Sequence, residues 1–316
     1  MLDFLPSPVK GALSFIGYLL NTICLTVPLI LTSILKSIIP FKGLIVLLDK
    51  FLIWIATLWI SINGLNCDLF NKIDWQVNGL TQLKKKDWYL VISNHQSWVD
   101  ILVLQKIFNR KIPMLKFFLK KELIWVPFLG LAWWALDFPF MKRYSKKFLE
   151  ANPHLKGKDL ERTRKACEKF KHTPVSVMNF VEGTRFTPEK HKRQNSPFAR
   201  LLLPKAGGIA FVLGSMGEYL HNIVNVAIAY PDGVPTFWDY ISGKTKQIIV
   251  DVDVFPVNER LIGDYFNNDG YKQQFCDWLN QIWQEKDKKL KELLFYDQPD
   301  QSPAWSGQSH VKKLKN

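Results

Sequence analysis

The sequence predicts an α/β layered domain preceded by apolar helices that anchor the chain in a membrane. Two observations support this fold class. Residues 11–35 are 25 consecutive residues without a charge, and from residue 65 onward short β-rich runs alternate with amphipathic helical patterns. The chain has 316 residues, of which 47% are hydrophobic. A chain of this size and composition can bury a large core, which excludes a disordered protein.

The first apolar run has the length of a membrane segment. As a helix it measures about 37 Å, which is enough to cross a bilayer. It exceeds the roughly 7–15 apolar residues of a signal peptide, and no small-x-small cleavage site follows, so we expect a retained anchor. A second apolar stretch, residues 44–62, contains Asp49, Lys50, Trp54 and Trp59. It is either a second span or a helix lying in the interface, and we expect anchoring helices over residues 1–66.

The α/β domain is expected over residues 67–296, followed by a flexible tail rich in Pro, Gln and Ser over 297–316. Alternating β-forming patterns predict strands at 75–79, 88–93, 174–181, 224–230 and 248–255. Helical patterns predict helices at 99–108, 116–135, 158–171, 207–216 and 271–294.

One part of the second predicted helix is unusual. Residues 123–136 carry no charge but contain three tryptophans, Pro127 and Gly130. This stretch is too short to span a bilayer, so we interpret it as a buried or membrane-dipping helix.

Charge and cysteine usage narrow the function classes. The formal net charge is +14, which favours anionic partners. The four cysteines, at positions 24, 67, 167 and 276, are widely separated, so they predict neither a disulfide framework nor a thiolate metal site, and they favour a reducing compartment. No GxSxG or GxGxxG motif and no histidine pair with metal-ligand spacing is found. We therefore expect no metal and no nucleotide cofactor.

The first candidate motif, residues 94–100, lies where a buried strand ends and a helix begins, a usual address for site residues in α/β sheets. His95 can remove a proton near neutral pH, and a carboxylate such as Asp100 would fix its tautomer. The alternative is structural: Ser97 and Asp100 fit a capping pattern, and His95 only ends the strand. The spacing alone supports the functional and the structural interpretation equally.

The second candidate motif, residues 180–185, also follows a β-forming run. Gly183 permits a turn with positive φ, and Arg185 can hold a phosphate with two parallel hydrogen bonds. Taken alone, this motif is more often a strand-end turn with a solvated ion pair. Three further blocks each favour an ordinary structural interpretation by themselves: residues 138–143, residues 225–231, and Lys205 with the glycines that follow it.

In this order, the blocks resemble the lysophosphatidate acyltransferase family, the 1-acyl-glycerol-3-phosphate O-acyltransferases, over residues 65–295. The combination of N-H-x-x-x-x-D with a downstream E-G-T-R is specific. The stretches 88–90, 125–132, 139–145 and 180–183 are most similar to an enterobacterial inner-membrane member. The resemblance implies a mixed sheet with helices packed on it.

The resemblance also implies a reaction and roles for individual residues. His95 is implied as the general base that deprotonates the free hydroxyl of 1-acyl-glycerol-3-phosphate, and Asp100 as the group that orients it. The product is phosphatidic acid, formed without an acyl-enzyme, a metal or a cofactor, with acyl-CoA or acyl carrier protein as co-substrate. The implied ligands of the glycerol phosphate are Arg143, Glu182, Gly183, Thr184, Arg185 and Lys205. We expect the acyl-chain path along Trp125, Leu129 and Trp133.

The expected partners are membrane lipids, the lysophospholipid and, as one candidate donor, acyl carrier protein; nucleic acid is not expected. The expected location is a bacterial inner membrane with the catalytic domain facing the cytoplasm. Three positions depart from the family pattern: Asp137 replaces a common Gly, Val181 a Pro, and Asn225 a frequent Pro. Two alternatives stay open. One is an acyltransferase for another lysophospholipid or polyol, and the other is a non-catalytic basic membrane protein, motivated by lysine clusters such as 84–86 and 190–193.

Overall fold

The computed structural model describes residues 2, 4–141 and 173–295. The predicted helix at 158–171, Arg143 and the predicted tail at 297–316 lie outside the described residues.

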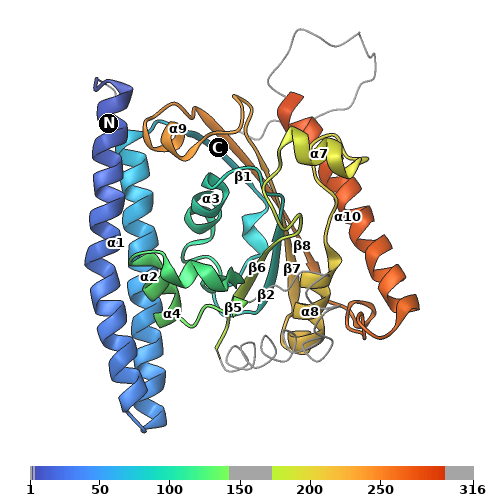
Figure 1. The fold of residues 1–316 in the computed structure, drawn as a ribbon, viewed down its shortest axis with the longest axis horizontal. Helices are drawn as coiled ribbons and strands as arrows, with labels where there is room; N and C mark the ends of the chain where they lie inside the picture. The colour runs from blue at the N-terminus through green and yellow to red at the C-terminus, as the bar shows by residue number, and fades with distance from the viewer. Residues whose placement is uncertain (1, 3, 142–172, 296–316) are drawn as a thin grey trace.

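Two long helices form an antiparallel hairpin along one end of the molecule (Figure 1). Helix α1 spans Ser7–Ile38 and α2 spans Lys42–Phe70, and both are long and apolar enough to cross a membrane. The second apolar stretch is therefore one continuous helix, in spite of Asp49 and Lys50. The charge of Asp49 is compensated, because its carboxylate pairs with the ammonium group of Lys36.

A six-stranded mixed sheet forms the centre of the α/β domain that follows the hairpin. Its order is β1-β8-β7-β2-β6-β3, and all neighbours are parallel except β7 and β8. The strands are β1 Asp74–Asn78, β2 Tyr89–Ser93, β3 Leu115–Phe117, β6 Ser176–Phe180, β7 Asn222–Ala229 and β8 Gln247–Pro256. The predicted α/β class is confirmed, and five of these strands lie where the alternation predicts them.

Helices cover both faces of the sheet, and the side chains of β2 show how. Leu90 and Ile92 pack with α8 (Ala206–Met216) and α10 (Asp269–Phe295), whereas Tyr89 and Val91 pack with α3 (Val99–Phe108) on the opposite face. All five residues of β2 are buried as a result. Two short helices, α7 (Pro188–Gln194) and α9 (Phe237–Ile241), lie near the carboxyl ends of the strands (Figure 1).

The predicted helix at 116–135 is wrong. This region forms β3, then β4 (Leu119–Lys120), which pairs with β5 (Phe140–Met141), then a 3-10 turn η2 (Lys121–Trp125) and the short helix α4 (Leu129–Ala135). The break has a local cause. Pro127 has no N–H to donate, and Phe128 adopts a left-handed φ of 61°, which no continuous right-handed helix contains.

The hairpin packs on the domain near both of its ends. Near its turn, Leu29, Leu52 and Ile55 share an apolar cluster with residues of α4, and Lys36 Nζ donates to Asp137 Oδ2 at 2.9 Å. Near the start of α1, Gly11 lies so close to Trp238 that a Cβ there would be 2.8 Å from the indole ring. The domain therefore covers one side of the hairpin over most of its length.

Asp137 is the position where the resembled family commonly has glycine. Its φ is 56°, a left-handed conformation that Asp tolerates better than most residues. The carboxylate adds the bond to Lys36, so Asp137 links the domain to α1.

Candidate active site

The candidate site lies at the carboxyl ends of three adjacent parallel strands. Ser93, the last residue of β2, pairs with Phe180 of β6 on one side and with Val226 of β7 on the other. The two sequence motifs, one after β2 and one after β6, therefore meet at one edge of the sheet. This is where site residues gather in α/β folds.

His95 and Asp100 form a hydrogen-bonded pair. His95 Nδ1 lies 2.9 Å from Asp100 Oδ2, and the imidazole is 13% exposed whereas the carboxylate is 1% exposed. The same oxygen accepts the backbone N–H groups of Gln96 and Ser97 at 2.6 and 2.9 Å. One carboxylate thus bonds both the backbone of the loop, as a capping residue does, and the ring of His95, while the catalytic role of the pair stays a prediction. With Nδ1 facing Asp100 as a donor, Nε2 is left as the acceptor that can take a proton.

Tyr230 binds the other oxygen of Asp100; it lies in the predicted block 225–231, but the sequence pattern assigned no role to it. Its hydroxyl donates to Asp100 Oδ1 at 2.6 Å. Burial and the neighbouring Asp100 raise the pKa of Tyr230 well above its ordinary value, so the hydroxyl stays a donor at physiological pH. Tyr230 lies directly after β7, 130 residues from Asp100, and only the strand order brings the two together.

Two further side chains fix the loop that carries His95. The ring of Phe180 stacks on the imidazole, with centroids 3.8 Å apart and an interplanar angle of 13°. The Asn94 side chain bonds the backbone of Ile228 in both directions, each at 2.9 Å. Because the imidazole is held on one face by Phe180 and at Nδ1 by Asp100, its orientation is set before any substrate arrives.

The side chain of Glu182 links the loop that carries His95 to the segment that contains Leu202. Its carboxylate is fully buried, Oε1 accepts the His95 backbone N–H at 2.8 Å, and Oε2 accepts that of Leu202 at 2.9 Å. Burial raises the pKa of Glu182 to about 7. The hydrogen bonds from the two backbone amides and the charge of Lys286 act in the opposite direction and lower this pKa. The resemblance places Glu182 among the phosphate ligands, but this geometry is that of a brace, with both oxygens turned to backbone amides.

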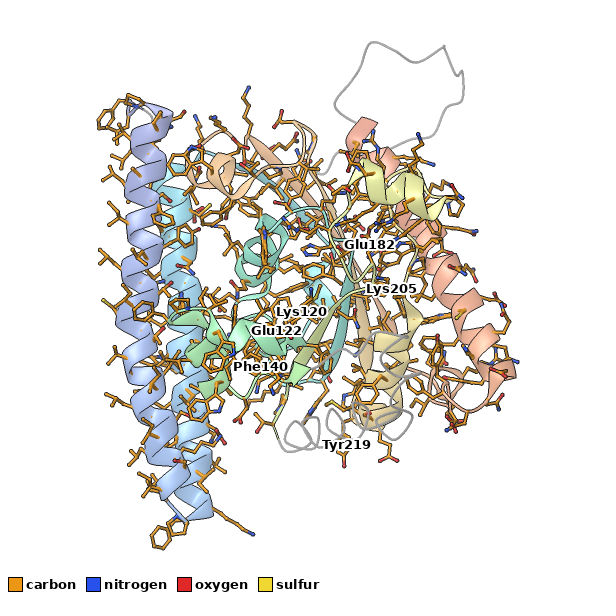
Figure 2. The ribbon with its side chains drawn as sticks, viewed as in Figure 1. Lys120, Glu122, Phe140, Glu182, Lys205 and Tyr219 are labelled. Carbon is orange, nitrogen blue, oxygen red and sulfur yellow. The ribbon has the colours of Figure 1, made fainter. Side chains whose placement is uncertain are left out.

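Gly183 and Lys205 lie against each other (Figure 2 labels Lys205 beside Glu182). Gly183 has a φ of 67°, and a Cβ there would lie 3.1 Å from Cδ and 3.2 Å from Nζ of Lys205. Glycine is required because the backbone is left-handed and because the lysine stem approaches so closely. This places the exposed Lys205 directly on the E-G-T-R loop.

Two more cations border the same loop. The guanidinium of Arg185 lies over the ring of Trp98, 5.0 Å from its centroid. Lys190 of α7 donates from Nζ to Thr184 Oγ1 and to the Arg185 carbonyl, both at 2.9 Å. Lys190 belongs to a lysine cluster that the sequence analysis related only to the non-catalytic alternative. Its bonds could not be seen from sequence, because they depend on α7 folding back on the loop.

An aromatic series runs from His95 toward α4. Phe180 contacts Phe117 at 6.1 Å between centroids, and Phe117 contacts Phe138 at 6.4 Å. Leu129 and Trp133 pack on the same cluster as Phe138, whereas Trp125 is 85% exposed. Of the three residues expected along the acyl path, two therefore join this apolar region and Trp125 lies outside it.

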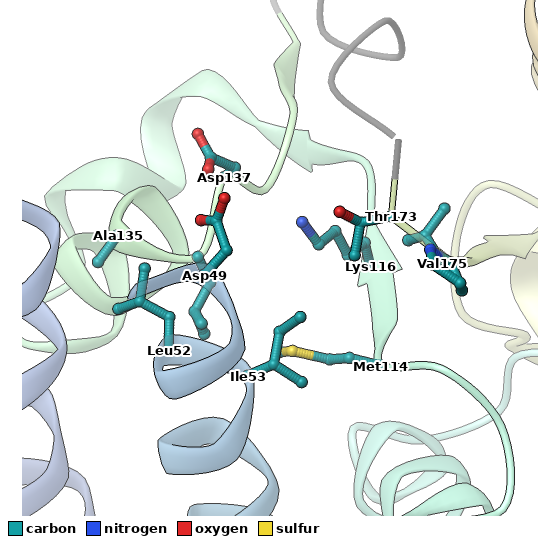
Figure 3. Close-up of a pocket in the computed structure, with 11 residues that line it drawn as sticks. Asp49, Leu52, Ile53, Met114, Lys116, Ala135, Asp137, Thr173 and Val175 are labelled. Atoms are coloured by element: carbon teal, nitrogen blue, oxygen red, sulfur yellow. The ribbon is translucent and has the colours of Figure 1, made fainter. Parts of the chain in front are cut away.

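A cavity of about 60 Å³ lies between α2 and β3 (Figure 3). Leu52, Ile53 and Met114 give it an apolar wall, and the carboxylates of Asp49 and Asp137 lie close together at its edge. His95 does not line it, so the cavity is separate from the candidate catalytic pair.

Comparisons with known proteins show which proteins this chain is similar to. The Acyltransferase family model matches residues 74–224. The 1-acyl-sn-glycerol-3-phosphate acyltransferase 3 of Arabidopsis thaliana is 25% identical over 313 residues, covering 94% of this chain and 75% of its own length. The 2-acyl-1-lysophosphatidylinositol acyltransferase of Saccharomyces cerevisiae is 24% identical, covering 67% and 62%. The human 1-acyl-sn-glycerol-3-phosphate acyltransferase gamma is 24% identical, covering 69% and 56%.

The chain thus spans three quarters of the plant relative but less than two thirds of the yeast and human ones. Among solved structures, the 1-acyl-sn-glycerophosphate acyltransferase of Thermotoga maritima aligns with a TM-score of 0.43 and 18% identity, over 84% of this chain and 96% of the other. The chain thus contains a region, residues 74–224, that matches the Acyltransferase family model, and over most of its length it is similar to 1-acyl-sn-glycerol-3-phosphate acyltransferases.

Proposed function

We propose that the protein transfers a fatty acyl group from an acyl thioester to the free hydroxyl of 1-acyl-glycerol-3-phosphate, making phosphatidic acid. The observation that carries this proposal is the His95–Asp100 pair, held rigidly beside a loop bordered by cations. A base next to an anion-binding loop suits an acceptor that has both a hydroxyl and a phosphate.

In the proposed reaction, His95 Nε2 takes the proton of the acceptor hydroxyl as its oxygen attacks the thioester carbonyl. The new C–O bond forms, the C–S bond breaks, and the imidazolium returns the proton to the leaving thiolate. Asp100 stabilises the transient imidazolium through Nδ1. Ester and free thiol are the products, so no acyl-enzyme and no cofactor is needed, and acyl-CoA or acyl carrier protein serves as donor.

The acceptor phosphate is proposed to bind at the E-G-T-R loop. Arg185 and Lys205 supply the charge, and Gly183 and Thr184 shape the backbone between them. Arg143, the last residue of the block 138–143, is proposed as a further ligand on the strength of the resemblance. The fork of an arginine can hold two phosphate oxygens at once.

The hairpin is proposed to place this site at a bilayer. The domain covers one side of α1 and α2, and the other side exposes a row of large apolar residues. On α1 these are Leu13, Ile16, Leu20, Val27, Leu31 and Leu35. Exposed aromatic residues of η2 and α4, Trp125 and Trp134, extend the apolar surface. We propose a bacterial inner membrane, with the domain on the cytoplasmic side, where a lysophospholipid can reach His95 from the lipid.

A panel of acceptors and donors tests the proposal. Purified protein in phospholipid vesicles is given an oleoyl thioester of CoA or of acyl carrier protein, together with lysophosphatidic acid, lysophosphatidylinositol, lysophosphatidylcholine or lysophosphatidylglycerol. Thiol release and lipid product are measured together. Preference for lysophosphatidic acid, the phosphate monoester, supports the proposal, whereas thiol release without acylated lipid contradicts it.

A second candidate is acylation of a different lysophospholipid. The name of the yeast relative, a 2-acyl-1-lysophosphatidylinositol acyltransferase, favours it. The same panel separates the two candidates, because a preference for lysophosphatidylinositol over lysophosphatidic acid would select the second.

A further inference from the structure

A lysine of the short helix α7 is bonded to the E-G-T-R loop but takes no part in the proposed reaction. Lys190 Nζ donates to Thr184 Oγ1 and to the carbonyl of Arg185, both at 2.9 Å. The two acceptors belong to adjacent residues, so one ammonium group fixes the side chain of the first and the backbone of the second. A loop tied in this way holds the guanidinium of Arg185 in a restricted set of orientations.

The backbone from which Lys190 reaches the loop is itself fixed. Thr187 caps α7, because its Oγ1 accepts the Lys190 N–H at 3.3 Å, and Pro188 occupies the start of the helix, where no N–H is needed. The next side chain, His191, has Nε2 2.6 Å from the carbonyl oxygen of Phe198. The half-buried side chain of Lys190 therefore leads from a rigid turn back to the loop.

Arg185 is held from two sides. Its guanidinium lies 5.0 Å from the centroid of the Trp98 ring, and Lys190 bonds its carbonyl. Trp98 follows His95 by three residues. The cation proposed to bind the phosphate is thus packed on the same segment that carries the proposed base.

The position of His95 does not depend on Lys190. Glu182 Oε1 accepts the His95 N–H at 2.8 Å, the His95 carbonyl accepts the N–H of Phe186 at 2.7 Å, and Asp100 holds the ring. Loss of the Lys190 bonds leaves these three contacts in place. We therefore expect the base to stay where it is, while the loop between Glu182 and Phe186 gains freedom.

We propose that Lys190 is a positioning residue for the acceptor phosphate: its two hydrogen bonds to Thr184 and Arg185 fix the guanidinium of Arg185 in the orientation that binds a phosphate monoester. The inference rests on the proposed function, because the phosphate in question is that of the proposed acceptor. It predicts that loss of the Lys190 ammonium weakens acceptor binding and leaves the chemical step and donor binding unchanged.

Steady-state kinetics of the full-length protein in vesicles measure this split. Lys190→Met keeps an unbranched stem but removes both bonds, so KM for lysophosphatidic acid is expected to rise about fivefold to tenfold, with kcat and KM for oleoyl-CoA unchanged. Lys192→Met is the matched control, since Lys192 is an exposed lysine of the same helix and its loss changes the net charge equally. All three constants are expected to stay at their wild-type values in this control.

The double variant Lys190→Met/Arg185→Met tests whether Lys190 acts through Arg185. Adding Lys190→Met to Arg185→Met is expected to raise KM for the acceptor no further, since the guanidinium that Lys190 places is already gone. A KM raised by the product of the two single factors would overturn the positioning role. A Lys190→Met protein in which kcat falls and KM does not change would overturn it too.

Binding without turnover separates a failure of this inference from a failure of the proposed function. Detergent-solubilised full-length protein is titrated calorimetrically with 1-hexanoyl-glycerol-3-phosphate, a water-soluble acceptor, and with 1-hexanoyl-glycerol, which lacks the phosphate. Lys190→Met is expected to raise Kd for the phosphate ligand about fivefold to tenfold and to leave the neutral ligand unaffected. Equal Kd values for wild type and Lys190→Met would overturn the inference even in an active acyltransferase, whereas binding without acylation by the wild type would count against the proposed function alone.

A second variant keeps the inference testable if Lys190→Met does not fold. Thr184→Val removes one of the two bonds without touching α7, and it is expected to raise Kd for the phosphate ligand severalfold. A folded Thr184→Val protein with the wild-type Kd would overturn the inference.

Discussion

Tyr230→Phe removes one hydrogen bond from the carboxylate of Asp100, the residue proposed to orient His95, and changes little else. The hydroxyl donates to Asp100 Oδ1 at 2.6 Å in a fully buried setting. A hydrogen bond to a charged group contributes about 1.5–3 kcal/mol, so we expect the free energy of unfolding to fall by that amount. For a domain of this size, where 1 kcal/mol shifts Tm by about 2–4 °C, the loss corresponds to a Tm lower by roughly 3–12 °C.

The effect of Tyr230→Phe on catalysis is expected in kcat alone. The three bonds to Asp100 Oδ2 remain, so the carboxylate stays in place but is held less firmly. If about 1 kcal/mol of the lost interaction raises the activation free energy of acyl transfer, kcat falls roughly fivefold. KM for lysophosphatidic acid should not change, because Tyr230 is buried and its hydroxyl is bonded to Asp100.

Thiol release in vesicles at saturating donor, with the acceptor varied, measures both constants. Tyr240→Phe is the control, since Tyr240 is a second buried tyrosine, in α9, that lies with Tyr18 on the side of the hairpin and has no hydrogen bond to Asp100 among the described residues. It should lower Tm without lowering kcat. A Tyr230→Phe enzyme with wild-type kcat, or with a change in KM only, would refute the reasoning.

Three further substitutions test other parts of the site. Asp100→Asn keeps the shape but loses the charge, so kcat should fall by roughly 10²–10⁴-fold with the fold intact by circular dichroism; a loss under tenfold would contradict the dyad. Gly183→Ala strains a positive φ and pushes on Lys205, so KM for the acceptor should rise severalfold while KM for the donor stays unchanged; equal changes in both would argue against a phosphate site there. Replacing Trp125 and Trp134 together by Gln should reduce the quenching of tryptophan fluorescence by brominated lipids; unchanged quenching would place these side chains in water.

Elements with a long, regular pattern were predictable from sequence. Helix α3 begins and ends where its apolar period does, and the strands around β2 follow from runs of β-branched residues. The region after residue 115 was not predictable, because β3, β4 and β5 have only three, two and two residues. Such short strands show no alternation, and their apolar residues then fit a helical period by chance.

The contact between His95 and Asp100 was predictable because the two residues are five positions apart in one motif. The buried residues around this pair were not predictable. Tyr230 ends a strand that reads as plain core, and Lys286 lies on a helix whose pattern explains an apolar stripe but not a buried cation. Both reach the site through the order of the strands and the docking of α10, which local patterns do not encode.

The central claim is that His95 acts as the general base of acyl transfer to a lysophospholipid hydroxyl. The most direct test measures thiol release and phosphatidic acid formation by wild type and His95→Ala, with folding of both checked by Tm. The account predicts one thiol released per phosphatidic acid formed by the wild type, and loss of both products in a folded His95→Ala protein. Phosphatidic acid formed by His95→Ala at the wild-type rate would contradict it.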